Sequence, residues 1–238
     1  MGSVPVIQAG VSYYGSGLGL SINAMATHME VLKGHADNIA NFGIPGYRKE
    51  TPHVTTFAEY LGPNGVEVSK SNEIGRLRQT NLPLDLALAE EGFFRVQDAK
   101  TARVSQTRDG RFMLQKDGLM TTITGQYVLN ELGQPIRITH APSDLKKGLK
   151  IDEHGILSVM DESSGKFSPV GRLSVVDEAG QKAAKIDVKQ GFIEDSNVML
   201  QDEFVGIIPL RRHFEANRQV FMIQNDNLSK LISELGRS

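Results

Sequence analysis

Residues 18–49 read LGLSINAMATHMEVLKGHADNIANFGIPGYRK, and this stretch decides how the rest of the chain is organised. Its apolar side chains recur at alternating intervals of four and three residues, which is the spacing of a coiled-coil seam. The seam positions are Leu18, Ile22, Met25, Met29, Leu32, Ala36 and Ile39. A helix with one apolar edge of this kind needs a second helix to cover it.

A matching pattern near the C-terminus predicts that second helix. One seam position recurs every seven residues at Leu200, Ile207, Phe214, Phe221, Leu228 and Leu235. A second seam position holds Leu210, Asn217, Gln224 and Leu231. Because each large apolar side chain gains about 1.5–3 kcal/mol on burial, the two helices have reason to pair with each other or to polymerise.

Two features of the stripes favour assembly between chains over a simple pair of helices within one chain. Met25 and Met29 are adaptable side chains that suit non-equivalent neighbours. Asn217 and Gln224 lie at seam positions, where polar residues favour a fixed register at a cost in stability. An ordinary intramolecular helix pair remains the alternative.

The ends of the C-terminal helix are marked in the sequence. Ser196 and Asn197 are both suitable N-cap residues, and Gly236 is a suitable stop after the last seam leucine. Pro209 lies inside the pattern and removes one backbone hydrogen bond. We therefore expect a kink or a break there, with a short helix over 198–208 before a long one that begins at the proline.

Glycine and proline also end the first helix and open a connector. Pro45-Gly46 suits the two central positions of a type II turn, because proline presets the first position and glycine tolerates the positive φ of the second. Between residues 50 and 75 the periodicity disappears and turn-forming residues gather. This segment is predicted to be a connector with short extended pieces.

From about residue 76 the apolar spacing changes to two. The leucines of 82–88 alternate with other residues, which predicts a half-buried strand. Further short apolar runs are separated by turn signals such as Asp109-Gly110 and Asp117-Gly118, and Asp-Gly is a favoured hairpin corner. Arg108, next to the first of these corners, is predicted to make a local ion pair in the turn.

The predicted fold class is α+β. Many short strands at near-regular spacing predict a central all-β domain, sandwich-like or barrel-like, inserted between two helices. The expected domains are a discontinuous helical domain with coiled-coil-like helices, formed by 1–49 and 196–238, a connector over 50–75 and a β domain over 76–195.

Composition excludes several classes of function. A length of 238 residues suits one sizeable domain or two small ones, and a net charge of −2 gives no reason to expect binding to nucleic acid or anionic membranes. The absence of cysteine removes disulfides and thiolate chemistry. No apolar run is long enough to span a membrane. The first basic residue is Lys33, so a secretory signal is not expected, and composition alone indicates a cytosolic protein.

Few side chains suggest chemistry. His28 and His35 lie seven residues apart, too far for chelation on one helix, and are expected to be solvated or at an interface. Asp85, Glu90 and Glu91 offer no recognisable cleft for acid–base work on a glycan, and are expected to be surface charges. We therefore expect no enzyme activity, no cofactor and no metal.

The stretch ADNIANFGIPGYRK resembles the signature at the end of the first helix in bacterial flagellar rod and hook proteins. The matching positions are Asn38, Ile39, Ala40, Asn41, Pro45, Gly46, Tyr47 and Arg48. Three further blocks are similar to the family in the right order: RQTNLPLDLALAEEGFFRV (78–96), QTRDGRFMLQKDGLMTTITGQYVL (106–129), and GFIEDSNV (191–198) with RRHFEANRQV (211–220). The resemblance covers roughly residues 20 to 235.

The resemblance implies a structural subunit of the flagellar basal-body rod. Such a subunit polymerises through its terminal helices into a tube around the export channel and transmits torque to the hook. The implied partners are other copies of the chain and the neighbouring proximal and distal rod proteins, with the surrounding basal-body rings as further candidates. The implied location is the rod in the periplasmic space, reached through the flagellar type III system without a cleaved signal peptide, which replaces the cytosolic interpretation.

Within the family, the chain looks most like the proximal rod protein next to the distal rod. The stretches that favour this assignment are LPLDLAL (82–88), Val-Gly-Arg-Leu at 170–173 and the Arg-Arg-His-Phe-Glu run at 211–215. A distal rod or hook-type axial subunit is the second choice. Residues 1–17 extend further ahead of the signature than the family leads us to expect, and indicate an arm that is flexible or ordered by a partner.

Two functions of other classes stay open. A monomeric enzyme acting on peptidoglycan would carry its activity in residues 76–192 and would need a clustered acidic cleft. A soluble adaptor or capping module would keep its helix pair closed on itself and would not polymerise.

Overall fold

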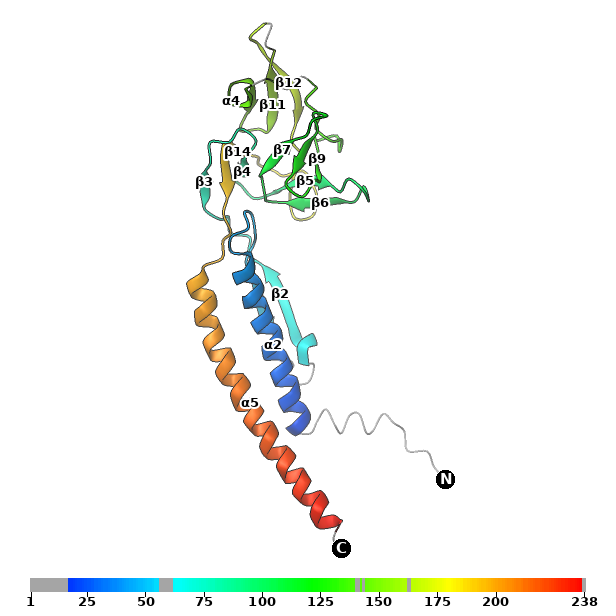
Figure 1. Cartoon of the computed structure of the whole chain (residues 1–238), viewed down its shortest axis with the longest axis vertical. Helices are drawn as coiled ribbons and strands as arrows, with labels where there is room; N and C mark the ends of the chain where they lie inside the picture. Colours follow the sequence, from blue (N-terminus) through cyan, green and yellow to red (C-terminus); the bar gives the residue numbers. More distant parts are fainter. Residues whose placement is uncertain (1–16, 56–61, 140–141, 143, 162–163, 237–238) are drawn as a thin grey trace, which may run out of the picture. The chain divides into compact units, whose positions relative to one another are not determined.

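The computed structural model of the chain describes residues 17–55, 62–139, 142, 144–161 and 164–236. Its helices and strands are labelled in Figure 1. The chain divides into two compact units. The first unit holds the described residues up to Ala40, together with Lys49–Ser71 and the described residues from Val198 onward, and the second holds Asn41–Arg48 and Asn72–Asn197. Helices from both ends of the chain and strands between them confirm the predicted α+β class.

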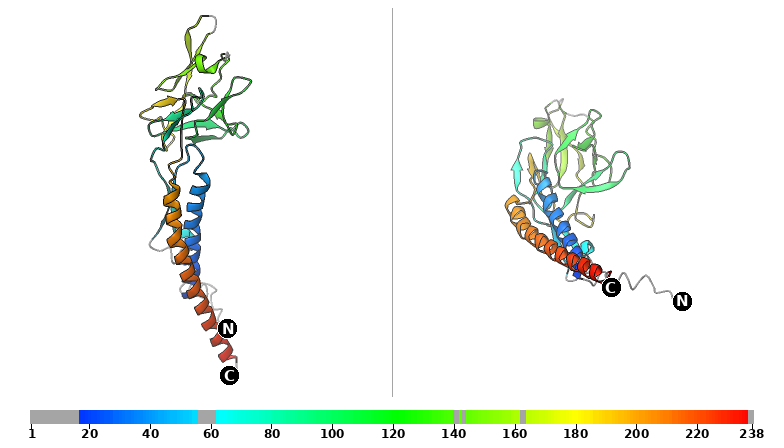
Figure 2. Two further views of the ribbon diagram at one scale, coloured as in Figure 1. Left: turned by 60° about the vertical axis from the view of Figure 1, so that its left-hand side comes forward. Right: turned by 60° about the horizontal axis from the view of Figure 1, so that its bottom comes forward.

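The first unit is built on two helices and a strand ribbon. Helix α2 (Gly17–Asn41) and helix α5 (Leu200–Leu235) lie side by side and run antiparallel (Figures 1 and 2). Strands β1 (Glu50–Val54) and β2 (Val66–Lys70) form an antiparallel ribbon, with a short 3-10 helix, η1 (Gly62–Gly65), before β2. The predicted connector therefore does contain extended pieces, and they pair with each other.

Small residues let α2 pack closely against its neighbours. The buried positions of α2 are Gly19, Ser21, Thr27, Val31, Gly34 and Asn38. Gly34 faces Pro52 of the ribbon, where a Cβ atom would lie 3.2 Å from the proline Cγ. The buried hydroxyls of Ser21 and Thr27 each donate to the carbonyl oxygen four residues earlier, at 2.9 Å, so they carry no unpaired polar atom into the interface.

Helix α5 is continuous over 36 residues, so the break expected at Pro209 is wrong. A proline within a helix removes one bond to the carbonyl four residues earlier, here that of Val205. Val205 is 66% exposed, so water can reach that carbonyl, while Ile207 and Leu210 on either side stay partly buried and hold the helix in place.

The start of α5 also differs from the expectation. The N-cap is Met199, which makes no side-chain capping bond, rather than Ser196 or Asn197. The amide of Asn197 instead donates to the carbonyl of Glu73 at 2.9 Å, so this residue is fixed in the second unit. The expected stop at Gly236 is confirmed as the C-cap.

The second unit is a β structure. A six-stranded sheet has the order β13-β5-β9-β8-β7, with β6 paired to β5, and a three-stranded sheet has the order β10-β11-β12. Two further pairs, β14-β4 and β15-β3, join strands from far apart in the sequence.

The bounds of these strands, with those of a short helix, are as follows: β3 (Leu77–Gln79), β4 (Leu86–Leu88), β5 (Phe93–Gln97), β6 (Val104–Thr107), β7 (Phe112–Leu114), β8 (Met120–Thr122), β9 (Tyr127–Val128), α4 (Leu145–Gly148), β10 (Leu149–Ile151), β11 (Ile156–Met160), β12 (Phe167–Arg172), β13 (Val175–Val176), β14 (Val188–Gln190) and β15 (Phe192–Glu194).

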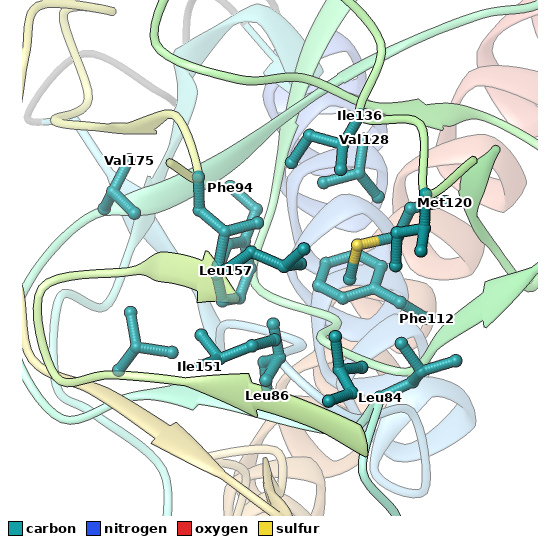
Figure 3. Close-up of a cluster of buried hydrophobic side chains, with 14 of the residues drawn as sticks. Leu84, Leu86, Phe94, Phe112, Met120, Val128, Ile136, Ile151, Leu157 and Val175 are labelled. Carbon is teal, nitrogen blue, oxygen red and sulfur yellow. The ribbon is translucent and has the colours of Figure 1, made fainter. Parts of the chain in front are cut away.

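One apolar cluster forms the core of this unit (Figure 3). Phe94 and Phe112 meet edge to face with ring centres 5.2 Å apart, and Leu86, Met120 and Leu157 fill the space around them. Burial of side chains of this size gains about 1.5–3 kcal/mol each. The second unit therefore has its own hydrophobic core.

Two sequence-based expectations for this unit are wrong. Only β4 is a strand within 82–88, and its three residues are buried on both faces rather than on one. Asp109-Gly110 is not a hairpin corner, because β6 before it pairs with β5 whereas β7 after it pairs with β8. The corner at Asp117-Gly118 is confirmed, since it joins the paired strands β7 and β8 and Gly118 has a φ of 80°.

Candidate functional site

The two terminal helices contact each other through polar side chains. His28 of α2 stacks on His213 of α5 with ring centres 5.6 Å apart, and His35 of α2 bonds Glu203 of α5 at 2.7 Å. Gly206 makes room for the second contact, because a Cβ there would lie 2.6 Å from the His35 ring. His28 and His35, which were expected to be solvated or at an interface, are therefore interface residues. The described residues contain no group of side chains suited to hold a metal ion.

Glu203 is the centre of a buried polar cluster at this interface. Its side chain is fully buried, at 0% exposure. One carboxylate oxygen accepts bonds from His35 Nδ1 at 2.7 Å and Asn38 Nδ2 at 3.1 Å, while the other lies 2.8 Å from Lys49 Nζ. A buried charge is tolerated only when it is paired in this way. The cluster thus ties the first turn of α5 to the end of α2.

Asn38 joins three elements at the same point. Its amide nitrogen donates to the carbonyl oxygen of Glu50 at 2.7 Å, and its amide oxygen accepts from the backbone nitrogen of Glu50 at 2.9 Å. The same nitrogen also donates to Glu203. One fully buried asparagine therefore fixes α2, the start of β1 and α5 together, which gives a physical reason for the asparagine of the sequence signature.

The charge state of Glu203 follows from two opposing effects. Burial alone would raise the pKa of its carboxyl group, but hydrogen bonds from Lys49, Asn38 and His35, with the charge of Lys49, lower the pKa below its ordinary value. A carboxyl whose folded pKa is depressed contributes stability at neutral pH, and this contribution is lost as the pH falls through the folded value. The Glu203 carboxyl group is therefore ionised at neutral pH.

The predicted stripe on α5 coincides with the less exposed side of that helix. Between residues 200 and 224 the residues that are not exposed are Leu200, Glu203, Gly206, Ile207, Leu210, Phe214, Asn217, Phe221 and Gln224. All but two of these are predicted seam positions. Beyond Gln224 the remaining seam residues are open to solvent, with Leu228 45%, Leu231 55% and Leu235 76% exposed.

The predicted stripe on α2 lies on the flank of its contact with α5. The α2 residues that touch α5 include His28 and His35, each one position before a seam residue. Leu32, four positions after His28, lies within about 60° of both histidines around the helix, whereas Met29 and Ala36 are turned by about 100° from the histidine that precedes each. Met29 is 53% exposed and Ala36 is exposed, while the other five seam residues are partly buried. Pairing with α5 therefore leaves Met29 and Ala36 of the α2 stripe uncovered.

Several large apolar side chains of helix α5 remain exposed although the helix pairs with α2. A monomeric soluble protein seldom leaves a large contiguous apolar patch open to water. The exposed apolar residues outside the seam of α5 are Phe204, Val205, Ile208, Val220, Met222, Ile223 and Ile232. The unit therefore presents apolar side chains for contact with another molecule.

The rest of the signature is fixed within the second unit. Gly46 has a φ of +71°, and the backbone nitrogen of Tyr47 bonds the Ile44 carbonyl at 3.2 Å, which confirms the predicted turn. The Gly46 nitrogen donates to the Glu194 carbonyl at 2.8 Å. The side chain of Arg48 lies 3.5 Å from the Glu194 carboxylate and also donates to the Glu73 carbonyl.

The local ion pair predicted for Arg108 is not found. Instead of a local ion pair in a turn, it forms a buried pair with Glu194, Nε to Oε2 at 2.7 Å, with both side chains 1% exposed. Its guanidinium also donates to the carbonyls of Leu88, Glu90 and Gly92. The neighbouring Asp109 makes the local ion pair with Arg111 instead. The buried pair links β15 to the loops around β4 and β5.

The carboxylates considered for glycan chemistry do not form a common site. Asp85 is buried at 7% exposure, so the expectation of a surface charge is wrong for this residue, whereas Glu90 and Glu91 are exposed. The arrangement gives no support to an acid–base pair.

Sequence reasoning missed Glu203 and Glu194. Glu203 was detectable, because it lies seven residues before Leu210 and so occupies the second seam position. A charge at a seam position is expected to have a buried partner. Glu194 lies in a short strand with no such periodicity, and its partner Arg108 is 86 residues away.

Comparison with known proteins gives consistent results. A family model described as the flagellar hook protein FlgE/F/G D1 domain matches residues 87–159, and one described as the flagellar basal body rod FlgEFG protein C-terminal matches residues 189–234. The flagellar basal-body rod protein FlgF of Rhizobium meliloti is 30% identical over 94% of this chain and 99% of its own length. FlgG of Bacillus subtilis is 26% identical over 73% of each chain, and FlgF of Escherichia coli is 26% identical over 82% of this chain and 88% of its own.

Proposed function

The chain belongs to the FlgE/F/G family of flagellar hook and basal-body rod proteins and is a structural subunit of the rod, and we propose that it polymerises through its two terminal helices. Members of this family are structural proteins and not enzymes. The helices of successive subunits form an inner tube around the export channel. The β units form an outer layer that stiffens the tube, and the assembly transmits torque to the hook.

One observation carries this proposal: α2 and α5 pair with each other and still leave apolar edges uncovered. Met29 on α2 and Leu228, Leu231 and Leu235 on α5 are predicted seam residues that are 45–76% exposed. A pair of helices closed on itself, as in an adaptor, would bury them. Contacts that join different surface patches head to tail do not close, and so build a helical filament.

Polar residues on the contact side of α5 support a defined register. Asn217 and Gln224 lie at seam positions and are partly buried. Polar side chains in a seam favour one alignment of the helices over others. A tube whose subunits must stack at a fixed rise needs such a constraint.

The proposed place in the rod is that of the proximal rod protein next to the distal rod. The match to FlgF of Rhizobium meliloti, over nearly the whole length of both chains, supports this assignment. A distal rod subunit is the alternative, because relatives named FlgG also match. Expression of the chain in strains that lack either their FlgF or their FlgG distinguishes the two: restored swimming only in the first supports the proximal assignment.

The proposed partners are other copies of the chain, the neighbouring proximal and distal rod proteins, and the surrounding basal-body rings. We further propose export by the flagellar type III system without a cleaved signal peptide, to a rod in the periplasmic space. No helix in the parts of the chain that the structure describes is long and apolar enough to cross a bilayer.

Substitution of Met29 by aspartate tests the assembly interface. Met29 is 53% exposed, so the change is expected to leave the folded monomer intact. In an assembled seam it would bury a charge, at a cost of several kcal/mol, and a cost of about 3 kcal/mol weakens association by roughly a hundredfold. Cells with this variant are expected to lose swimming and to lack complete rods.

The matched control is Lys33→Asp, on the same helix but outside the stripe. The Lys33 side chain is 65% exposed and its bond to Glu30 is at the surface, so this pair contributes at most about 1 kcal/mol. The control is expected to swim. Normal swimming by cells with Met29→Asp would contradict the proposed interface, provided that both purified variants show the same helix content.

A further inference from the structure

Loops of the second unit enclose a pocket of about 300 Å³. Its wall is formed by the segment that leads into β5 and by the turn that follows β13. This volume lies at the lower end of the range for binding sites, which suits a side chain better than a large ligand. The lining residues, which we call the Arg48 pocket, are Arg48, Asn72, Glu91, Gly92, Phe93, Asp177, Glu178 and Ala179.

Arg48 brings a buried hydrogen-bond donor to this pocket. Its side chain is only 9% exposed. One terminal nitrogen donates to the carbonyl oxygen of Glu73, and the other lies 3.5 Å from the Glu194 carboxylate. The third nitrogen, Nε, is buried and has no hydrogen-bond partner among the described residues. A buried N–H group is seldom left unpaired in a folded protein, so the pocket favours an occupant that brings an oxygen acceptor.

The charges around the pocket are arranged in two layers. Inside the unit, Arg48 shares the Glu194 carboxylate with Arg108, which pairs with it more closely, at 2.7 Å. Three acidic side chains of the pocket lie at the surface instead, and none of them forms an ion pair in the part of the chain that the structure describes. These are Glu91, Asp177 and Glu178. The pocket therefore combines a buried donor with an exposed negative rim.

This combination defines the chemistry of the occupant. A free anion would accept a bond from Arg48 but would be repelled by the three carboxylates of the rim. An apolar group would leave Nε without an acceptor. A lysine residue within a peptide chain meets both demands, because its backbone carbonyl oxygen accepts from Nε and its ammonium group pairs with the rim. The partly buried ring of Phe93 suits the aliphatic stem of such a lysine.

The α4 turn of the same chain carries lysines of this kind. Lys146 and Lys147 are adjacent and exposed. The side chain of Lys147 is 83% exposed, and its ion pair with Asp144 is long, at 4.0 Å. Figure 1 shows α4 and β11 toward one end of the second unit, and β5 and β6 toward the other. The turn therefore does not reach the pocket of its own molecule and is available to that of another.

We propose that the Arg48 pocket binds a lysine of the pair Lys146–Lys147 from the α4 turn of a second copy of the chain. The contact joins two different patches of the surface, so it runs head to tail and adds a subunit without closing the assembly. It gives the β units a contact of their own beside that of the terminal helices. Its place in the rod rests on the proposed function, whereas the binding itself is measurable in solution.

Binding of a peptide to the full-length chain tests the pocket. The probe is the acetylated and amidated peptide Leu-Lys-Lys-Gly-Leu, which is residues 145–149, and the control peptide has glutamine in place of both lysines. Nuclear magnetic resonance follows the Nε–H signal of Arg48 and the backbone amide signal of Phe93. We expect both signals to shift with the probe and to stay in place with the control. No shift with the probe, or equal shifts with both peptides, would overturn the proposal.

Variants of the rim test the role of its charges. Glu91→Gln, Asp177→Asn and Glu178→Gln together should weaken binding of the probe by about tenfold, because three ion pairs at the surface are lost. The control is Asp117→Asn, which removes an exposed carboxylate of the same unit outside the pocket and should leave binding unchanged. Equal affinity of the probe for both variants would overturn the negative rim as the source of specificity.

A concentration series of the full-length protein tests the second copy as the occupant. The Arg48 and Phe93 signals should move with rising concentration in the direction seen with the probe, and should stay in place in the variant with Lys146→Gln and Lys147→Gln. A movement that persists in this variant, or none in the natural chain up to its solubility limit, would overturn the α4 turn of a second copy as the occupant. The terminal-helix contact is tested separately by Met29→Asp, so the two proposals fail independently.

Discussion

Removal of the Glu203 carboxylate is the perturbation whose effect the structure defines best. Glu203→Ala deletes the acceptor of bonds from His35, Asn38 and Lys49. Loss of one partner of a buried ion pair generally costs about 3–5 kcal/mol. Here the side chains of His35 and Lys49 are 18% and 30% exposed and regain some water, so we expect a loss of about 2–3 kcal/mol.

Hydrogen exchange measures this loss where it occurs. Since 1.4 kcal/mol is a factor of ten, protection of the amides in the first turns of α5 and the last turns of α2 should fall roughly 30- to 150-fold. Amides of the β unit should be unaffected, because none of the four residues belongs to it. The control is Glu215→Ala, which removes only an exposed pair with Arg211 and should cost less than about 1 kcal/mol. Equal exchange in both variants would refute the role of Glu203.

Three further changes have expected outcomes. Gly46→Ala should lower the stability of the β unit by more than about 1 kcal/mol in thermal unfolding, because φ is +71° and the new Cβ would lie 2.5 Å from the Arg108 backbone. Arg108→Met should cost about 3–5 kcal/mol in the same assay, since it leaves the Glu194 carboxylate buried without its main partner. Burial, and then the neighbouring His213, lower the pKa of His28 below 6.5, so the helix contact should weaken as the pH falls below that value, seen as faster exchange in α2.

Each of these changes has a control within the chain. Gly43→Ala adds a Cβ with nothing within 4 Å and should be nearly neutral. Arg111→Met breaks an ion pair whose arginine is 36% exposed, and should cost less than about 1 kcal/mol. For the pH effect, His213→Ala should reduce the pH dependence of stability. Without His213 the pKa of His28 is lowered less on folding, so the folded and unfolded chains differ less in the number of protons that they bind at acidic pH. A pH dependence that is unchanged in this variant would contradict the stacked pair as its source.

The seven-residue spacing on α5 was enough to locate its contact side. Ile207, Phe214 and Phe221 recur at a fixed interval, and a helix converts such an interval directly into one face. The same reasoning located the apolar edge of α2, but did not show that α2 meets α5 through His28 and His35. The spacing of apolar residues does not show which polar residues meet across two helices, although the position of Glu203 in the seven-residue repeat marks one of them.

The errors have similar physical causes. The Pro209 expectation counted a lost hydrogen bond and omitted the partly buried neighbours Ile207 and Leu210, which keep the helix continuous. Arg108 was interpreted from its immediate neighbour Asp109, whereas its partner Glu194 is brought close by the pairing of distant strands. Asp85 was treated as a surface charge because the burial of both faces of β4 depends on strands elsewhere in the sequence.

A density map of basal bodies isolated from cells that carry this chain tests the central claim most directly. The claim is that the apolar edges left open by the pairing of α2 and α5 are covered by other rod subunits. The map should show both helices in the innermost layer of the rod, with Met29 and Phe204 in contact with neighbouring subunits. Helices that lie outside the rod wall, or whose open edges face only solvent, would contradict it.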